Sequence, residues 1–218
     1  MIPIVEKENF LSIDDCNLLI EYQKSHADND SSNWSLDDHK SNWESRIFVC
    51  TEIDDDNIRN IIESVHYRVC TLCAKFYEEE VVYPEFSNLV YWGPGMELGA
   101  HADNYWIDDP EKPHYSCHRD YSAVINLNDS YVGGETFFAG TEYKVIPKIG
   151  KLVLFTSGKD HIHGVKEVIS GSRYTMALWF TKNRDKIFKL LKNNNFTRIS
   201  AQTRHDDWYI NNEIHNSL

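Results

Sequence analysis

The spacing of apolar residues divides the chain into a helical first part and a β-rich second part. Residues 13–25 place apolar side chains at helical spacing, and Ser12 followed by Asp15 resembles a helix-capping signal. A second helical pattern begins at an Asp-rich cap in residues 54–56 and continues to about residue 79. The pattern therefore predicts two helices before residue 80, the second being the longest in the chain.

From residue 81 onward the pattern changes to short strand-like segments separated by Gly, Pro, Asn and Asp. Strand-like RIFVCTEI at 46–53 precedes this region, and the polar, turn-rich residues 26–44 predict a long loop. Short strands without helices between them are typical of an antiparallel sandwich or barrel. The predicted strands lie in VVYPEF, NLVYW, GAHADNYW, YSAVINLN, ETFFA, TEYKVI, KLVLFTS, IHGVKEV and SRYTMALWF.

The length of 218 residues suits one domain rather than two. Within it we expect a helical N-terminal support region at 1–80, a β core at 81–183 and a C-terminal extension at 184–218 that begins helix-like and ends polar. The predicted fold class is mainly β with flanking N-terminal helices.

Composition narrows the possible partners and location. The formal charge of −12 and the lack of a basic patch disfavour nucleic acid and anionic lipid. No window approaches the roughly 20 apolar residues of a membrane helix, and the first residues do not resemble a secretory signal. Five cysteines without a framework suit a reducing compartment, and Cys70 and Cys73 fit a helix face better than a metal or redox pair. We expect a cytoplasmic protein of undefined oligomeric state.

The stretch AHADNYW at 100–106 holds the first candidate chemistry. In a strand, residues i and i+2 share a face, so His101 and Asp103 would present an imidazole and a carboxylate side by side. Such a pair suits a two-His, one-carboxylate iron site, which needs a third ligand from elsewhere. His161 and His163, on one predicted strand face in KDHIHGV, both qualify.

A charged residue in the last predicted strand is the second candidate. Arg173 follows His163 by ten residues and shares a strand face with Thr175 and Ala177. A guanidinium buried inside a barrel needs a carboxylate partner. Its planar group can donate two parallel hydrogen bonds to the two oxygens of one carboxylate. That partner is either an internal Asp or Glu or the carboxylate of a ligand.

These features together resemble a known enzyme family. The order H-x-D, distal His, then Arg, with YWGPGMELGAHAD and YSAVINLNDSYVGGETFF, is similar to the Fe(II)/2-oxoglutarate dioxygenases, in particular their prolyl 4-hydroxylase-like branch. The resemblance extends over about residues 85–181, and ENFLSIDDCNLLIEY resembles that branch's N-terminal helix. It implies a double-stranded β-helix core, also called a jelly roll or cupin-like fold.

The resemblance assigns roles to the candidate residues. It implies that His101, Asp103 and His163 hold iron and that Arg173 binds the distal carboxylate of 2-oxoglutarate. His163 is preferred to His161 because the following H-G-V and the spacing to Arg173 match the family. His161 is then expected beside the ligands or at the loop mouth.

Four further positions are implied to lie near the cosubstrate. Tyr91 matches a tyrosine of the cosubstrate pocket in some members, and Thr175 matches a small polar residue near the site. Leu98 and Asn126 stand where many members have tyrosines that help to hold 2-oxoglutarate, so the hydrogen bonding of the cosubstrate is expected to differ here.

The implied reaction converts 2-oxoglutarate and O2 to succinate and CO2 while an unactivated C–H bond is hydroxylated. Fe(II) and ascorbate are implied with it, and the carboxylate of Asp103 favours hydroxylation over halogenation. A prolyl residue of a protein or peptide is the family-level substrate; a free amino acid or other small metabolite is the competing one. The loop at 104–120 would form a lid carrying Tyr105, Trp106 and Arg119, or pack the rim.

Two other classes use part of the same residue set. A β-helix domain that binds a metal or ligand without turnover would keep the two-His, one-Asp set. A zinc hydrolase could also use that set, but it has no need of Arg173.

Overall fold

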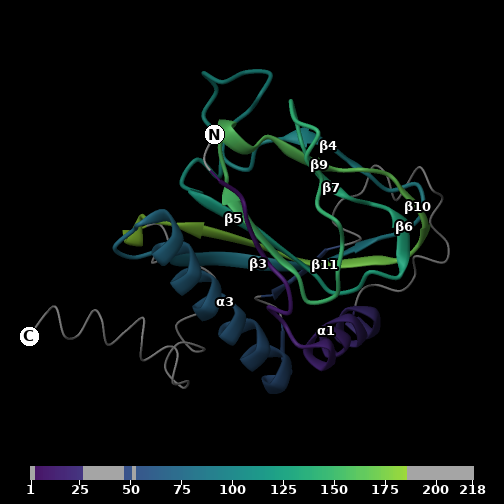
Figure 1. The fold of residues 1–218 in the computed structure, drawn as a ribbon. Coiled ribbons are helices and arrows are strands. Elements are labelled where there is room, and N and C mark those ends of the chain that lie inside the picture. Colours follow the sequence, from purple (N-terminus) through teal and green to yellow (C-terminus); the bar gives the residue numbers. More distant parts are fainter. Residues whose placement is uncertain (1–2, 27–46, 51–52, 186–218) are drawn as a thin grey trace, which may run out of the picture.

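The computed structural model describes residues 3–26, 47–50 and 53–185 (Figure 1). Most of the predicted loop at 26–44 and nearly all of the C-terminal extension lie outside the described residues. No helix in the described part of the chain is long and apolar enough to cross a membrane.

The two predicted helices are present at nearly the expected positions. Helix α1 (Ile13–His26) begins after Ser12, whose hydroxyl accepts a hydrogen bond from the Asp15 backbone N–H at 3.0 Å. Helix α3 (Asp56–Tyr77) begins after Asp55, whose carboxylate accepts from two backbone N–H groups of the first turn. Both capping predictions are confirmed.

The strands form one six-stranded sheet, here called the major sheet, and two small sheets. Every neighbouring pair is antiparallel, as the pattern predicted. The major sheet has the order β1 (Val5–Lys7), β8 (Leu152–Thr156), β5 (Tyr121–Asn126), β11 (Arg173–Thr181), β3 (Tyr83–Trp92) and β2 (Ile47–Val49). The small sheets are β4 (Leu98–His101), β9 (His163–Val165) and β7 (Thr136–Phe138), and β10 (Val168–Gly171) with β6 (Tyr131–Gly133).

Several strand boundaries differ from the prediction. VVYPEF and NLVYW belong to the single strand β3, because Pro84 lies near its start and the buried Ser87 and Asn88 continue the pairing with β11. The segment TEYKVI makes only one isolated bridge, between Lys144 and Phe137, and is not a strand. The short strands β1 and β6 were not predicted, since three residues carry too little alternation.

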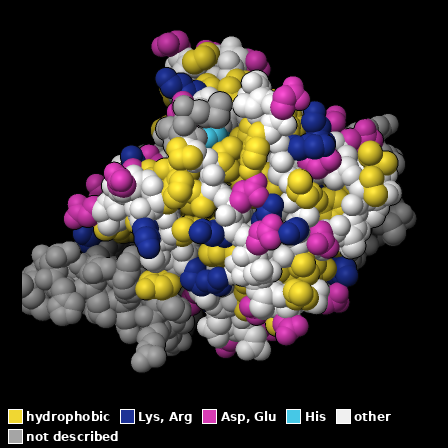
Figure 2. Space-filling view, in the orientation of Figure 1, with side chains coloured by type: hydrophobic (Ala, Val, Ile, Leu, Met, Phe, Trp, Pro, Cys, Tyr) yellow, Lys and Arg dark blue, Asp and Glu magenta, His cyan; other side chains and the backbone are white. Residues whose placement is uncertain are grey.

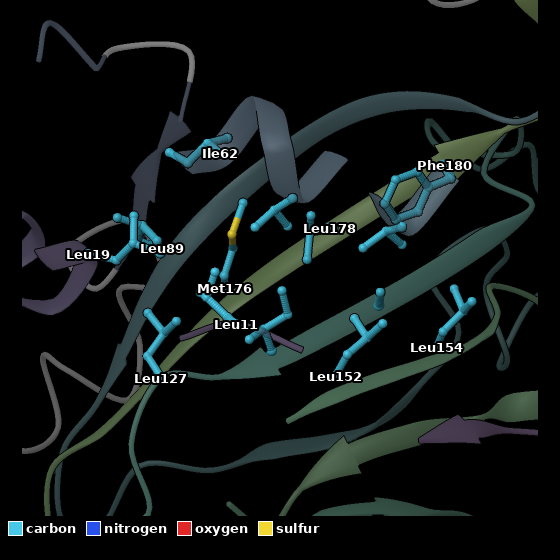
Figure 3. Packing of buried hydrophobic residues seen from close by; sticks show 14 of the residues in the cluster. Leu11, Leu19, Ile62, Leu89, Leu127, Leu152, Leu154, Met176, Leu178 and Phe180 are labelled. Atoms are coloured by element: carbon cyan, nitrogen blue, oxygen red, sulfur yellow. The ribbon is translucent and has the colours of Figure 1, made fainter. Parts of the chain in front are cut away.

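Side chains of β11 alternate between two environments. Met176, Leu178 and Phe180 are fully buried in the core cluster, together with residues of α1 and α3 (Figure 3). Figure 1 shows both helices on one side of the major sheet and the small sheets on the other. The intervening residues of β11 therefore face a space between the sheets.

The surface carries both signs of charge despite the net charge of −12. In the face shown in Figure 2, acidic and basic side chains are interspersed among apolar ones. This face has no extended patch of one sign that would attract a polyanion or polycation.

Truncation of the central strand tests this packing. We expect Leu178→Ala to lower the free energy of unfolding by about 2–5 kcal/mol, because the side chain is fully buried and its loss leaves a cavity. Leu18→Ala is the control: that leucine is 50% exposed on α1, and its change should stay within about 0.5 kcal/mol. Urea unfolding measures both, and equal losses would contradict the packing described.

Candidate active site

A cavity of about 650 Å³ lies on the face of the major sheet opposite the helices. Its walls come from β3, β5 and β11, from β4 and β9 of the three-stranded sheet, and from the loop at 102–120. This volume is in the range of small-molecule sites.

Antiparallel pairing brings the two candidate histidines together. His101 ends β4, His163 begins β9, and the two are directly opposite each other, with ring centroids 4.5 Å apart. Asp103 lies between them: its oxygens are 3.6 Å from Nε2 of His101 and 3.7 Å from Nε2 of His163. One ligand atom from each residue lies within 4.8 Å of the others, close to the roughly 3–4.4 Å that separates ligands about 2.0–2.2 Å from one ion. In the described part of the chain this is the one such cluster.

Asp103 reaches the cluster for a reason that the strand argument missed. Strand β4 ends at His101, so the two residues do not share a strand face. Instead the Asp103 backbone N–H donates to the carbonyl of Ser157 at 2.9 Å, and the Ser122 hydroxyl donates to the Asp103 carboxylate at 2.6 Å. The hydroxyls of Ser122 and Ser157 are themselves 2.7 Å apart. Partners on β5 and after β8 therefore fix the carboxylate.

Both cluster histidines have their outer nitrogen held by the backbone. Nδ1 of His101 lies 3.0 Å from the Gly99 carbonyl, and Nδ1 of His163 lies 3.0 Å from the His161 carbonyl. A carbonyl can only accept, so Nδ1 carries the proton and Nε2 keeps its lone pair toward the cluster.

His161 is not on a shared strand face with His163, which corrects that part of the prediction. It lies in a short 3₁₀ helix, η4 (Lys159–His161), and its Nδ1 accepts from the Thr156 backbone N–H at 3.2 Å. The side chain therefore stabilises the turn before β9, while its carbonyl orients the ring of His163.

The protonation states of His163 and Asp103 suit metal binding, whereas His101 is held closer to its protonated form. Burial lowers the pKa of His163 to about 4, so this ring is neutral at neutral pH. Burial raises the pKa of Asp103, but the charges of His163 and His101 and the hydrogen bonds outweigh it, and the pKa is lowered overall. Burial also opposes the charged form of His101, yet the hydrogen bond and charge of Asp103 leave its pKa raised. A neutral imidazole beside a carboxylate is the form that ligates a metal.

Arg173 is the most deeply buried charged side chain of the cavity, with 1% exposure. Its Nη2 donates to the Thr136 hydroxyl at 3.2 Å, and its guanidinium carbon lies 5.1 Å from the Trp92 ring centroid. Among the described residues, Nε and Nη1 have no hydrogen-bond partner within normal geometry, and no acidic residue forms an ion pair with the guanidinium. The phenol of Tyr131 is a nearby polar group that favours the charged form of the arginine. Burial nevertheless lowers the pKa of Arg173. Of the two alternatives for its partner, the described residues favour a ligand carboxylate.

A glycine makes room for this arginine. Gly134 has φ +66°, and a Cβ there would lie 3.1 Å from Cδ of Arg173 and 2.9 Å from the Val168 side chain. Any other residue would both strain the backbone and displace the arginine.

The remaining predicted pocket residues divide into two groups. Thr175 and Leu98 line the cavity, and the Thr175 hydroxyl accepts from the Trp92 indole N–H at 3.3 Å. Tyr91 does not line this cavity: alternation along β3 turns it to the opposite face, where its ring centroid lies 5.4 Å from that of Tyr174. Asn126 pairs with Thr175 across the sheet but does not line the cavity.

Two contacts of Arg173 were missed in the sequence. Trp92 follows Tyr91, and Thr136 lies in the predicted strand ETFFA. Alternation from Arg173 cannot identify either one, because both lie on other strands and meet the arginine only through pairing and sheet packing.

The loop at 102–120 lines the cavity with Tyr105, Trp106 and Arg119, a position that fits both the lid and the rim-packing predictions. It is anchored by a buried ion pair, in which Nε and Nη2 of Arg119 donate to the Glu85 carboxylate at 2.7 and 3.1 Å. The same guanidinium lies 4.2 Å from the Trp179 ring centroid. The loop is thus fixed to β3 and β11.

Comparison of the sequence with models of protein families finds a match that spans the cavity residues. Residues 86–181 match the model of the 2OG-Fe(II) oxygenase superfamily. The matched segment contains His101, Asp103, His163 and Arg173. The family resemblance noted in the sequence is confirmed.

The individual relatives are prolyl hydroxylases. Human prolyl 3-hydroxylase 2 is 41% identical over 92 residues, which cover 37% of this chain but only 13% of the relative. The structure of the viral collagen prolyl hydroxylase from Paramecium bursaria Chlorella virus-1 gives a TM-score of 0.59 at 18% identity, covering 83% and 96% of the two chains. A Trichoplax adhaerens prolyl hydroxylase in complex with a hypoxia inducible factor peptide fragment gives 0.61 at 16% identity, covering 86% and 87%. These structures confirm the double-stranded β-helix fold.

The loop anchor yields a test of its own. We expect Glu85→Ala to lower the free energy of unfolding by about 3–5 kcal/mol, because it leaves the Arg119 charge buried without its partner. Glu21→Ala removes the exposed ion pair with Lys24 and should cost at most about 1 kcal/mol. Denaturant unfolding of the two variants compares them directly; a loss for Glu85→Ala as small as that of the control would refute the anchoring role.

Proposed function

We propose that the chain is an Fe(II)- and 2-oxoglutarate-dependent dioxygenase that hydroxylates a prolyl residue of a protein or peptide, with succinate and CO2 as coproducts. The observation that carries the proposal is the buried guanidinium of Arg173, which lacks an acidic partner among the described residues and opens into the same cavity as the His101, Asp103 and His163 cluster. The His101, Asp103 and His163 cluster alone would fit several classes of metalloprotein. The added carboxylate-binding group is what a 2-oxo acid requires.

The donor set fits Fe(II). Two imidazole nitrogens and one carboxylate form the facial set of non-haem iron oxygenases, which leaves other positions open. His101 and His163 direct Nε2 inward because their Nδ1–H groups are bound to backbone carbonyls. Ser122 holds Asp103, so the carboxylate keeps its orientation before any ion binds.

The cosubstrate fits the Arg173 end of the cavity. A carboxylate bound end-on would accept from Nη1, which has no partner among the described residues, and from the second N–H of Nη2, whose other contact is Thr136. Trp92 covers the guanidinium and Thr175 lies beside it on β11, so water is excluded from the pair.

The chain's residues supply geometry and the cofactors supply the oxidation. Fe(II), 2-oxoglutarate and O2 provide the chemistry that turns one 2-oxoglutarate and one C–H bond into succinate, CO2 and C–OH. Asp103 and the two histidines would hold the ion, and Arg173 would bind the distal carboxylate of the cosubstrate. Ascorbate remains a prediction, tested by adding it to the assay.

The prolyl substrate is supported by the relatives' names. The sequence relative is a prolyl 3-hydroxylase, and the structures of similar fold are prolyl hydroxylases, one of them solved with a peptide fragment. The cavity is bounded by aromatic side chains, including Trp106 and Trp179, which suit an apolar prolyl ring. A free amino acid is the second candidate, and the assay below separates the two.

The decisive experiment measures succinate formed by the purified protein, loaded with Fe(II) without oxygen and then exposed to air. We expect iron-dependent succinate that rises with prolyl peptides more than with free amino acids, and mass spectrometry of the peptide should show one added oxygen and locate its carbon. His163→Ala should abolish this succinate, whereas His26→Ala, on α1, should not.

Three other results would identify another class. If only free amino acids stimulate succinate formation, the substrate is a free amino acid and not a prolyl residue of a peptide. Iron binding without succinate would favour the non-catalytic domain. Hydrolysis that persists without O2 and 2-oxoglutarate would indicate the zinc hydrolase.

Arg173→Ala tests the cosubstrate site. We expect 2-oxoglutarate affinity to fall by about 2–5 kcal/mol, that is, roughly thirtyfold or more, through loss of a charge-assisted pair. Arg173→Lys should recover part of this loss, because it keeps the charge without the fork. Arg68→Ala, an exposed arginine on α3, is the control. Calorimetric titration under anaerobic conditions provides the affinities, and normal binding by Arg173→Ala would disprove the assignment.

A further inference from the structure

Asn88 is a buried polar residue of the cavity that the reaction so far does not use. It lies on the cavity face of β3, paired with Ala177 of β11, and is 6% exposed. Its Oδ1 has no hydrogen-bond partner among the described residues. Other polar side chains of the same wall are matched: the Thr175 hydroxyl accepts from Trp92, and Ser122 donates to Asp103. A buried acceptor without a partner costs free energy, so a ligand group is expected there.

The position of Asn88 separates it from the cosubstrate end. Arg173 pairs with Trp92, whereas Asn88 lies four residues earlier on β3, about 13 Å along the strand at roughly 3.3 Å per residue. Across the sheet, Asn88 is two strands from β5, whose Ser122 holds Asp103, or on the order of 10 Å. Asn88 is therefore too far from Arg173 to share its carboxylate and close enough to the cluster to contact a substrate.

Ala177, which is paired with Asn88 on β11, is small and also lines the cavity, so the Asn88 amide is buried in a wall without a bulky side chain directly opposite it. Trp179, the next residue on the same face of β11, adds an aromatic wall. The surroundings suit a segment with one polar group and an apolar ring.

The charges around Asn88 favour a neutral group over an ionised one. The second guanidinium of the cavity, Arg119, is already bound bidentately to Glu85. Lys112 is exposed, with its ammonium 5.4 Å from the Trp106 ring centroid. A free amino acid would bring a carboxylate and an ammonium, whereas a peptide bond brings a neutral N–H that an amide oxygen accepts.

We infer that Asn88 accepts a hydrogen bond from a main-chain N–H of a peptide substrate and so is a specificity-determining residue that favours peptides over free amino acids. The inference rests on the proposed function. A prolyl nitrogen has no hydrogen, so the donor is the amide of a residue near the hydroxylated one.

An ester scan tests this contact. Starting from the prolyl peptide with the highest kcat/KM, each non-prolyl amide is replaced in turn by an ester, which removes one N–H. We expect one position at which the ester raises KM roughly three- to tenfold for the wild-type protein, the loss expected for one neutral hydrogen bond. With Asn88→Leu, which keeps the volume without the acceptor, the parent peptide should show the raised KM and the ester should add no further increase.

Matched variants exclude indirect effects. Asn60→Ala, at an exposed position on α3, should show the same ester effect as the wild-type protein. Asn88→Leu should bind 2-oxoglutarate with the affinity of the wild-type protein, which would show that the cavity is folded. If Asn88→Leu binds it more weakly, Asn88→Ser is used in place of Asn88→Leu.

The two levels of inference fail differently. Ester effects of equal size in the wild-type and Asn88 variants at every position would overturn the Asn88 contact and leave the prolyl hydroxylase proposal intact. Turnover of free amino acids and of no prolyl peptide by the wild-type protein would overturn the proposed substrate and this inference with it.

Discussion

Strand β11 must satisfy two environments at once, and the architecture around it follows from that constraint. Its residues alternate between a face packed on α1 and α3 and a face turned to the cavity. Met176, Leu178 and Phe180 bind the helical layer to the sheet, while Arg173 and Thr175 project the opposite way. Because side chains alternate with a period of two, a shift of one residue would place the guanidinium in the helical core. Stability and chemistry therefore depend on one register.

The second constraint is the charge of Arg173, which has no acidic partner in the part of the chain that the structure describes. A buried guanidinium without an acidic partner is unfavourable in the isolated protein, so its surroundings must be held by other contacts. Trp92, Thr136 and the glycine at 134 supply them, from three different segments. The arrangement keeps the guanidinium, the proposed carboxylate-binding group, in the same cavity as the His101, Asp103 and His163 cluster. Oδ1 of Asn88, in another part of the cavity wall, is likewise buried and has no hydrogen-bond partner among the described residues.

Much of the fold and the central site could be predicted from local pattern. Helical spacing and capping residues determined α1 and α3, since caps such as Ser12 and Asp55 act on neighbouring backbone groups. The order of His101, Asp103, His163 and Arg173 indicated the site because family members share that order. The local pattern did not show toward which face of the sheet Tyr91 points, nor that β4 ends at His101.

The sequence by itself determined which elements form and which side chains carry chemistry, because these depend on residue type and short-range spacing. Tertiary structure decided which groups meet. Pairing of β4 with β9 set His101 opposite His163, and Ser122 of β5 gave Asp103 its orientation. Thr136 and Asn88 reach the cavity wall in the same way. Contacts between strands distant in sequence depend on register and sheet packing, which no local pattern encodes.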